Sequence, residues 1–382
     1  MKTESKIRFK KYNDVWENVK LTEVAPIVMG QSPDSKNYTD NPNDYILVQG
    51  NADMQNGRVV PRVWTTQVTK LAEKGDLILS VRAPVGDIGK TDYNVVLGRG
   101  VAAIRGNDFL FYLLSRMKQT NYWAKFSTGS TFESINSSDI KSAEICLPSP
   151  EEQSAIGSLF RTLDDLLTSY KDNLANYQSL KATMLSKMFP KTGHTVPEIR
   201  LDGFEGEWET KILSEVTNIT MGQSPKSENY TDNPNDYILV QGNADIKDKQ
   251  VVPRLWTTEV TKMAEIGDII LTVRAPVGDI GKTDYNVVIG RGVAAIKGND
   301  FIFYTLEKMK MTGFWNRFST GSTFDSISSN DIKEAIIQIP TLKEQQAIGS
   351  YFYNLDQLIT SYQEKISQLE TLKKKLLQDM YI

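Results

Sequence analysis

Three hydrogen-bonding side chains in the first part of the chain have the chemistry needed to read the edges of nucleic-acid bases. Gln49, Asn51 and Asp53 alternate directly after the apolar run 46–48. In an extended segment this alternation places all three on one face. Gln and Asn can bridge N6 and N7 of adenine, and Asp can accept a hydrogen bond from N4 of cytosine. The triad therefore predicts a base-reading face, with a solvated strand end as the alternative.

Arginines follow runs that have the composition of strands. Arg82 precedes Ala-Pro, and Arg99 lies between two glycines. The guanidinium fork can bind guanine O6 and N7 or a phosphate, and an ion pair within the protein is the alternative. Arg62 lies nearby in the sequence and is a further candidate, whereas its neighbour Trp64 is expected in the core.

A polar loop at 127–131, Ser-Thr-Gly-Ser-Thr, offers hydroxyl and backbone N–H groups. Such groups fit against phosphates, which position a protein on DNA without reading its sequence. Lys125, or Arg317 at the same place in a second copy, would add positive charge, and a plain connecting loop is the alternative. The candidates from this loop and from the segment Met-Gly-Gln-Ser-Pro at 29–33 are Gln31, Ser32, Ser130 and Thr131.

The segment that carries these residues recurs 192 residues later. Between 29–104 and 221–296, only 14 of 76 positions differ. A period of this length indicates a duplicated domain and not a solenoid repeat. The corresponding candidates in the second copy are Gln223, Ser224, Gln241, Asn243, Asp245, Arg254, Arg274, Arg291, Ser322 and Thr323.

Each copy divides into a mixed α/β part and a long helix. β-rich runs bounded by Asn, Gly and Pro predict strands at 45–48, 76–81 and 94–97. A buried helix is predicted at 108–117 and again near 300–309. The expected fold is α/β (α+β), with near-identical α/β domains at 7–148 and 199–340, helical regions at 149–192 and 341–382, and an approximate two-fold axis.

A capping-box pattern begins each long helix, Ser149 with Glu152 and Thr341 with Glu344. Apolar residues then alternate at spacings of four and three, as in the seam of a coiled coil, and Asn173 interrupts them. Antiparallel packing of the two helices is the simplest arrangement, and folding of each helix onto its own domain is the alternative. The seam residues expected to carry helix and partner contacts are Leu163, Leu166, Tyr170, Tyr177, Leu355, Leu358, Tyr362 and Leu369.

The composition excludes several chemistries. Cys146 and His194 are the only residues of their types, so neither an internal disulfide nor a Cys/His zinc site can form. The net charge of −3 means that any nucleic-acid binding depends on local patches or on a partner. No apolar run reaches the length of about 18 residues that a membrane span needs, and no secretory signal begins the chain, so we expect it in the cytoplasm.

Several motifs in a fixed order resemble the specificity subunit of type I restriction-modification enzymes. They are Met-Gly-Gln-Ser-Pro, Gly-Asp-Leu-Ile-Leu-Ser-Val-Arg-Ala at 75–83, Gly-Ser-Thr-Phe at 129–132, and Leu147-Pro148 followed by Glu152-Gln153. Arg200-Leu201 and Glu207-Trp208 add to the set before the second copy. Their order, repeated at a fixed offset over nearly the whole chain, makes the resemblance specific.

This resemblance implies a DNA-recognition subunit with no catalysis of its own. The α/β domains would be target recognition domains, each reading one half of a bipartite double-stranded DNA sequence. The helices would set the gap between the halves and dock two methyltransferase subunits, which restriction and translocase subunits then join. S-adenosylmethionine, ATP and magnesium are expected on those partners, and no cofactor or metal is expected on this chain.

The chain departs from the usual pattern of this family because its two recognition domains are nearly identical. Identical readers related by a two-fold axis see the same half-site on opposite strands, which predicts a palindromic, interrupted target. The differences gather at 54–58 against 246–250, and at Asp34 and Lys36 against Lys226 and Glu228. If 54–58 contacts bases, the palindrome is imperfect; a hairpin tip at 55–57 is the other interpretation.

Two other functions remain open from the residues. The first is a DNA-modifying enzyme that acts alone, but Asn-Pro-Asn-Asp-Tyr at 41–45 lacks the second proline of the amino-methyltransferase motif. The segment 86–91 also has Pro84 where a nucleotide-binding P-loop needs glycine. The second is a coiled-coil adaptor with no role on DNA.

Overall fold

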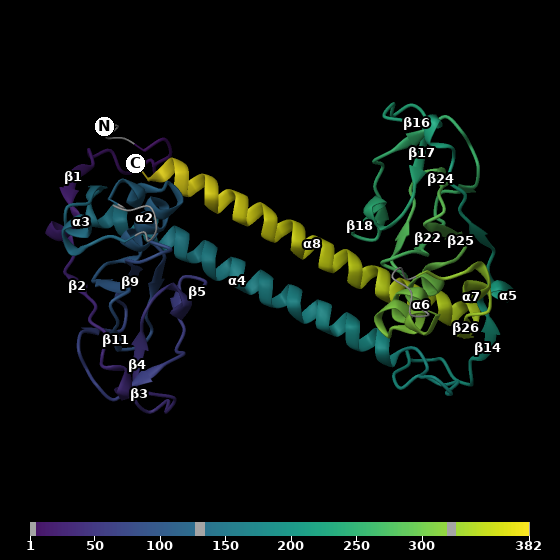
Figure 1. Cartoon of the computed structure of the whole chain (residues 1–382), viewed down its shortest axis with the longest axis horizontal. Coiled ribbons are helices and arrows are strands. Elements are labelled where there is room, and N and C mark those ends of the chain that lie inside the picture. The colour runs from purple at the N-terminus through teal and green to yellow at the C-terminus, as the bar shows by residue number, and fades with distance from the viewer. Residues whose placement is uncertain (1–4, 127–133, 319–325, 382) are drawn as a thin grey trace. The chain divides into compact units, whose positions relative to one another are not determined.

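The computed structural model describes residues 5–126, 134–318 and 326–381, and it divides the chain into two compact units (Figure 1). Unit 1 contains residues 1–171 and 364–382, and unit 2 contains residues 172–363. Each long helix, α4 (Pro150–Lys187) and α8 (Leu342–Met380), contributes one part to each unit. A unit is therefore a sheet domain together with a stem made from parts of both helices.

The sheet domain of unit 1 has a five-stranded sheet in the order β3-β7-β4-β11-β8 and a six-stranded sheet in the order β2-β12-β9-β10-β6-β5. A two-stranded ribbon, β1-β13, accompanies them. Its strands are β1 (Glu17–Lys20), β2 (Ile27–Met29), β3 (Tyr38–Thr39), β4 (Tyr45–Val48), β5 (Met54–Gln55), β6 (Arg58–Val59), β7 (Trp64–Thr65), β8 (Leu71–Ala72), β9 (Leu77–Ser80), β10 (Ile88–Lys90), β11 (Val95–Leu97), β12 (Val101–Ile104) and β13 (Glu144–Leu147). Its helices are α1 (Leu21–Val24), α2 (Asp108–Gln119) and α3 (Ser137–Lys141), with 3-10 turns η1 (Ser35–Asn37), η2 (Asn51–Asp53) and η3 (Tyr122–Phe126).

Unit 2 repeats the same sheet orders. Its strands are β14 (Glu209–Ile212), β15 (Ile219–Met221), β16 (Tyr230–Thr231), β17 (Tyr237–Val240), β18 (Ile246–Lys247), β19 (Gln250–Val251), β20 (Trp256–Thr257), β21 (Met263–Ala264), β22 (Ile269–Thr272), β23 (Ile280–Lys282), β24 (Val287–Ile289), β25 (Val293–Ile296) and β26 (Ile336–Ile339). Its helices are α5 (Leu213–Val216), α6 (Asp300–Met311) and α7 (Ser329–Lys333), with 3-10 turns η4 (Ser227–Asn229), η5 (Asn243–Asp245) and η6 (Phe314–Phe318). The predicted mixed α/β fold with two similar sheet domains and long helices is confirmed.

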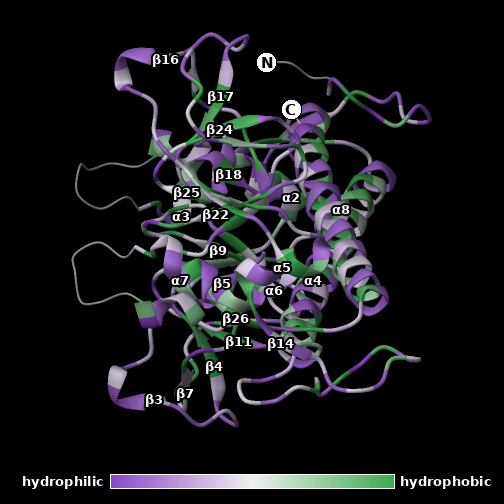
Figure 2. Cartoon of the chain, turned by 90° about the vertical axis from the view of Figure 1, so that its right-hand side faces the viewer, coloured by the Kyte–Doolittle hydropathy of each residue, from purple (hydrophilic) through white to green (hydrophobic). Residues whose placement is uncertain are grey.

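Central strands are apolar along their whole length because both of their faces are covered. β9 and β12 are buried at every position, and so are their copies β22 and β25. In the view of Figure 2 the colouring is mostly hydrophobic along β24, whereas the tips near β3 and β16 are hydrophilic. A continuous run of buried Val, Ile, Leu and Ala is the pattern expected of such strands.

The sheet domain and the stem of each unit share one core through the predicted buried helix. In unit 1 the rings of Phe109 on α2 and Tyr381 after α8 lie 4.9 Å apart, and Tyr112 lies 5.0 Å from Phe160 on α4. In unit 2, Phe189 lies 5.3 Å from Phe301 on α6. Burial of an aromatic side chain of this size contributes about 1.5–3 kcal/mol, so these rings attach the domain firmly to the stem.

The two helix segments of each stem run antiparallel. In unit 1 Lys171 on α4 pairs with Glu370 on α8 at 2.6 Å. Asp164, two turns earlier on α4, pairs with Lys373, which lies later on α8. In unit 2 Tyr177 lies 5.3 Å from Tyr362. Antiparallel packing was the arrangement expected from the sequence.

The predicted seam is partly wrong. Leu163, Leu355 and Leu369 are buried within the stems, but Leu166 is 39% exposed and Leu167 is buried in its place. Asn173, the predicted interruption, and its neighbour Leu174 are both half-buried. The reason is that Ile156 and Phe160 fix the helix against α2, which sets a stripe one residue away from the one that the leucines alone suggest.

The predicted capping boxes are only half formed. The N–H of Glu152 donates to Oγ of Ser149 at 3.4 Å, but its carboxylate accepts two hydrogen bonds of 2.7 Å from Arg8. Glu344 binds Arg200 in the same way, at 2.7 and 2.8 Å. A bidentate arginine is a stronger partner than a backbone N–H, so each glutamate ties the start of its helix to the segment that leads into the sheet domain.

Candidate nucleic-acid interface

Four loops of unit 1 meet at one rim because of the direction of the strands that precede or follow them. β4 and β11 are parallel, so their carboxyl ends lie together. β12 is antiparallel to both β2 and β9, with Ala102 opposite Met29 and Val101 opposite Ser80. The residues after β2, β4 and β9 therefore meet the turn between β11 and β12.

Glycines allow this rim to close tightly. A Cβ on Gly100 would lie 2.0 Å from the carbonyl oxygen of Gln49, and a Cβ on Gly30 would lie 2.0 Å from that of Gly98. Neither contact is possible for any other residue type, so both positions require glycine. Their copies Gly292 and Gly222 meet the same atoms of unit 2 at 2.0 and 2.1 Å.

The rim surrounds a small cavity of about 240 Å³, which we call the polar pocket. Oγ of Ser32 accepts a hydrogen bond of 3.0 Å from the backbone N–H of Arg99, which fixes one wall. Arg82 leaves the end of β9 and forms a β-bridge with Ser134. The lining of the polar pocket is Ser32, Gln49, Gly50, Asn51, Arg82, Ala83, Arg99 and Gly100.

Both arginines of the polar pocket keep their guanidinium groups available. Arg82 and Arg99 are exposed, and within residues 5–126, 134–318 and 326–381 neither forms an ion pair with a carboxylate. The same holds for Arg274 and Arg291 of unit 2 in that part of the chain. An ion pair was the alternative to nucleic-acid contact, and none forms at these four side chains within the described residues, so nucleic-acid contact stays a prediction for them.

Unit 2 repeats the serine and arginine contacts of this rim, and Asn243 makes one further contact. The N–H of Arg291 donates to Oγ of Ser224 at 3.0 Å, and Arg274 bridges Ser326. Gln241 follows β17 as Gln49 follows β4, and Asn243 donates to the carboxylate of Asp279. Every side chain named for the polar pocket thus has an identical copy in unit 2.

The prediction that Gln49, Asn51 and Asp53 share a face of an extended segment is wrong. β4 ends at Val48, and residues 51–53 form the 3-10 turn η2. The carboxylate of Asp53 is buried and accepts from the N–H groups of Gln49 at 2.7 Å and Gly50 at 3.2 Å. Asp245 repeats this with Gln241 and Gly242. These two aspartates therefore shape the rim and do not face outward.

Arg62 and Arg254 also serve the rim from outside the polar pocket. Arg62 donates to the carbonyl of Ala52 at 3.0 Å and lies 3.5 Å from Asp53. Arg254 donates to the carbonyl of Ala244 at 2.9 Å and lies 3.6 Å from Asp245. Both side chains remain more than half exposed, at 53% and 54%, but the structure gives each of them a local partner that the sequence did not suggest.

The remaining candidates lie elsewhere. Gln31 and Gln223 are exposed on the loop after β2 and β15, beside the serines of the rim. Ser130, Thr131, Ser322 and Thr323 lie outside the described residues. The two cations expected beside these residues contact aromatic rings: Lys125 lies 3.7 Å from the ring of Tyr122, and Arg317 lies 3.6 Å from that of Phe314.

The positions at which the two copies differ do not belong to the polar pocket. Residues 54–59 form the hairpin β5–β6, with Asn56 and Gly57 at φ of 51° and 73°. The corresponding hairpin β18–β19 carries Lys249, which contacts the stem. Asp34 and Lys36 pair at 3.4 Å, and their replacements Lys226 and Glu228 pair at 3.7 Å with the charges exchanged.

Two structural residues were missed in the sequence. Lys249 and Glu307 form an ion pair of 2.6 Å in unit 2, where unit 1 has Gly57 and Ser115. The signal was present, because two positions 58 residues apart acquire opposite charges together in one copy of a repeat. Cys146 lies within β13 and is half-buried, and burial raises the pKa of its thiol.

No set of three His, Cys, Asp or Glu side chains within the described ranges is arranged to hold a metal ion. In the same ranges, none of the helices is both long enough and apolar enough to cross a membrane.

The sequence matches the model of one protein family twice. The type I restriction modification DNA specificity domain matches residues 13–176 and 205–371. These two matches cover most of the chain, and each takes in one sheet domain and part of a long helix. The chain belongs to the type I restriction-modification DNA specificity family.

Known relatives agree with this assignment. A putative type I restriction enzyme MjaX specificity subunit from Methanocaldococcus jannaschii is 31% identical over 283 residues, which are 70% of this chain and 66% of that protein. The type I restriction enzyme MjaIX specificity subunit from the same organism is 23% identical over 57% of this chain and 55% of its own length. The chain thus spans slightly less than two thirds of the first relative and about half of the second.

Solved structures match over nearly the full length. A chain from a structural study of complex assembly and conformational transition of the type I R-M system has a TM-score of 0.59 at 25% identity, with 96% of this chain and 97% of that chain covered. The HsdS subunit from Thermoanaerobacter tengcongensis has a TM-score of 0.51 at 25% identity, covering 96% and 95%. The S subunit from M. genitalium, at 17% identity, shares the fold with a TM-score of 0.65 over 99% of both chains.

Proposed function

We propose that this chain is a non-catalytic subunit that recognises an interrupted DNA sequence, with one polar pocket for each half-site. The observation that carries the proposal is a closed rim where two arginines lie beside Gln49 and Asn51 and form no ion pair with a carboxylate within the described residues. Arginine can take both acceptors of guanine, and glutamine or asparagine can take the donor and acceptor of adenine. The same side chains stand at the rim of unit 2.

The proposed target is a palindrome with a gap. Ser32, Gln49, Asn51, Arg82 and Arg99 are each matched by the same residue type in unit 2. Half of the 14 differences between 29–104 and 221–296 lie in the 54–59 hairpin and in an exposed charge pair, and none of the 14 is a lining residue of the polar pocket. Two readers of identical chemistry select the same short sequence, so a half-site and its inverse complement are expected.

The proposed partners are two methyltransferase subunits, joined by restriction and translocase subunits, for which the helical stems serve as the docking frame. S-adenosylmethionine, ATP and magnesium would belong to these partners. Exposed leucines on the stems, such as Leu166 at 39% and Leu372 at 44%, offer apolar surface to such partners. The buried residues Leu163, Leu355 and Leu369 hold the stems together instead.

Two experiments test this function. Binding of the chain together with its methyltransferase to target duplex, titrated with salt, should show a steep fall of log K with log salt because phosphate contacts release counterions. A flat response would indicate an adaptor without a DNA role. Transfer of label from S-adenosylmethionine to DNA should require the methyltransferase, and methylation by this chain alone would show that it is an enzyme.

A further inference from the structure

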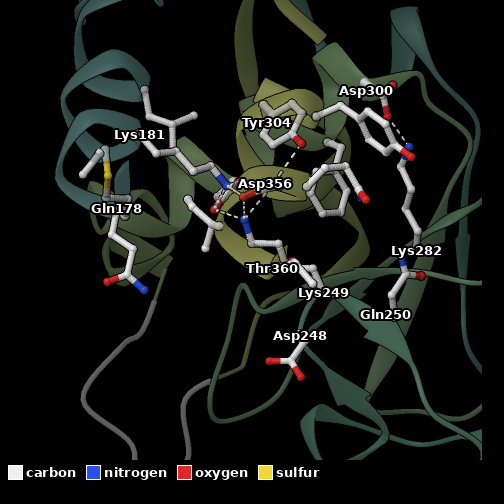
Figure 3. A pocket seen from close by; sticks show the side chains of 18 of the residues that line it. Gln178, Lys181, Asp248, Lys249, Gln250, Lys282, Asp300, Tyr304, Asp356 and Thr360 are labelled. Carbon is white, nitrogen blue, oxygen red and sulfur yellow. Dashed lines mark hydrogen bonds and ion pairs between the residues drawn. The ribbon is translucent and has the colours of Figure 1, made fainter. Parts of the chain in front are cut away.

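The two units differ most clearly where a hairpin meets the stem. In unit 2 the Nζ of Lys249, on hairpin β18–β19, lies 2.6 Å from Glu307 on α6 and 3.0 Å from Asp356 on α8. Lys181 on α4 lies 2.7 Å from Asp356 and 2.9 Å from Glu307. Figure 3 shows Lys181 and Lys249 both reaching Asp356 at the wall of a cavity of about 540 Å³. One cluster thus joins the hairpin to helix α6 and to both helices of the stem.

The cluster is balanced in charge, and so is its smaller counterpart in unit 1. Unit 2 has two lysines, Glu307 and Asp356, whereas unit 1 has only Lys373 and Asp164 at the same places. Either residue alone, Lys249 or Glu307, would leave one charge unmatched beside Lys181, whose side chain is 7% exposed. An unmatched charge beside a side chain as buried as Lys181 is unfavourable. This explains why the two charges occur together in one copy and are both absent from the other.

The hairpin backbone adopts its conformation at a cost. Asn56 and Gly57 suit a two-residue turn with positive φ, but unit 2 has Asp248 at φ 49° and Lys249 at φ 64°. A residue with a Cβ in this region costs about 1–2 kcal/mol. A Cβ at Gly57 would also lie 3.0 Å from the ring of Phe111, so the aromatic ring must give way where lysine is present. Local turn chemistry therefore favours glycine, and the contacts of the ammonium group oppose it.

The hairpin is directly connected to the rim of the polar pocket. β18 begins at Ile246, the residue after η5, and η5 contains Asn243 and the rim-shaping Asp245. β19 pairs with β23, and β23 with β22, the strand that leads to Arg274. A contact that restrains this hairpin therefore also restrains η5 on one side of the rim and the strand leading to Arg274 on the other.

We propose that Lys249 and Glu307 form a clip, present in unit 2 only, that fixes the β18–β19 hairpin on the stem and so orients the second polar pocket relative to the helices. The two residues are positioning residues for one half-site. The clip makes the two recognition domains, which carry identical polar pockets, unequal in how firmly each is held. This inference rests on the proposed function for its effect on DNA, but the clip itself is a property of the chain.

The first test uses the full chain with K249G and E307S together, the residues that unit 1 carries at these places. Amide hydrogen exchange at 246–251 should become about tenfold faster, as expected when a local opening loses its restraint, and should approach the rate at 54–59. D248N, which changes the same turn outside the clip, should leave the rate nearly unchanged. Unchanged exchange in the double variant would overturn the proposal.

A second test measures the coupling between Lys249 and Glu307. Each single variant, K249G or E307S, should lower Tm by more than the double variant does, because only the single variants leave an unmatched charge. Additive changes in Tm would show that the two residues act independently, which contradicts a clip.

The third arm measures orientation on DNA, with the cognate methyltransferase present and duplexes whose gap is native, one base pair shorter or one base pair longer. The wild-type protein should prefer the native gap, and the double variant should lose several-fold of this preference while its binding to the native duplex changes less. Equal weakening on all three duplexes would show a loss of stability and not of positioning. Absence of binding by the wild type would contradict the proposed function and leave the exchange result to decide the clip.

Discussion

At the scale of single residues, the polar pocket separates side chains that face outward from those that build it. Arg82, Arg99 and Gln49 line the cavity, whereas Asp53 holds the backbone of the turn beneath them. Residue type alone made all of them candidates for base contact. The distinction depends on which side chains find partners inside the protein, and only the folded rim shows that.

Replacement of one equivalent arginine at each rim, R82A with R274A, should weaken binding to the target by about 1–3 kcal/mol per half-site, since each half-site loses a bidentate base contact. Binding to unrelated duplex should change little. Competition between target and unrelated DNA measures this difference. The matched control is R105A with K297A, exposed cations that pair with Glu73 at 2.9 Å and Glu265 at 2.7 Å. A uniform loss on all sequences would identify Arg82 and Arg274 as phosphate contacts, and no loss would refute their role.

Asp53 should behave differently from the arginines. D53A removes the acceptor for two backbone N–H groups, so the free energy of unfolding should fall by about 1–3 kcal/mol. The preferred bases should stay the same because the carboxylate faces inward. Denaturant unfolding and selection from a randomised duplex pool check the two halves of this expectation. A change in the preferred base would show that Asp53 reads DNA after all.

At the scale of elements, the sequence was a good guide to the strands and a weaker one to the helix surfaces. β4, β9 and β11 lie where apolar runs between turn residues predicted them, and α2 lies where a buried helix was expected. Both follow from local patterns. The buried stripe of α4 was misplaced because it depends on which helix α4 meets, and the capping glutamates were misassigned because their arginine partners are 144 residues away.

The stability of unit 1 should depend on Tyr381, the residue that follows α8. Tyr381 is buried, its ring lies 4.9 Å from Phe109, and its hydroxyl donates to the carbonyl of Phe109 at 3.2 Å. Y381A should lower the free energy of unfolding of unit 1 by about 3–5 kcal/mol, as for other large-to-small changes in a core. Y93A, at a tyrosine that is 44% exposed, is the control. Equal effects of the two variants in thermal unfolding would contradict this account of the stem.

The clip of unit 2 should be sensitive to acid. Burial alone would raise the pKa of Asp356, but Lys249 and Lys181 hold it below its ordinary value of 3.8. A carboxylate whose pKa is lower in the folded state stabilises the fold above its ordinary pKa, and this contribution is lost as the pH falls through the folded value. Thermal unfolding followed from about pH 6 to about pH 3 should therefore show a loss of stability that begins near pH 4. D356N should lower stability at pH 6 and flatten this dependence, and an unchanged slope would contradict it.

At the scale of the whole molecule, the duplication accounts for most of the design. Each unit contains one part of each long helix, so the stem of each sheet domain is built from both helices. Ile7 donates to the carbonyl of Asp379 at 3.0 Å in unit 1, and Ile199 donates to that of Lys187 at 3.0 Å in unit 2. The same junction is thus made once by the chain ends and once by a continuous segment. Two sheet domains with the same rim side chains are the expected outcome of such a duplication.

The most direct test of this account is a map of the methylated bases in DNA modified by this chain with its cognate methyltransferase. The account predicts one motif, a short half-site, a fixed gap and the inverse complement of that half-site, because every lining residue of the polar pocket recurs in unit 2. Two unlike half-sites would contradict the identity of the readers and direct attention to 54–58 and 246–250. The absence of any modified motif would contradict the assignment of sequence recognition to this chain.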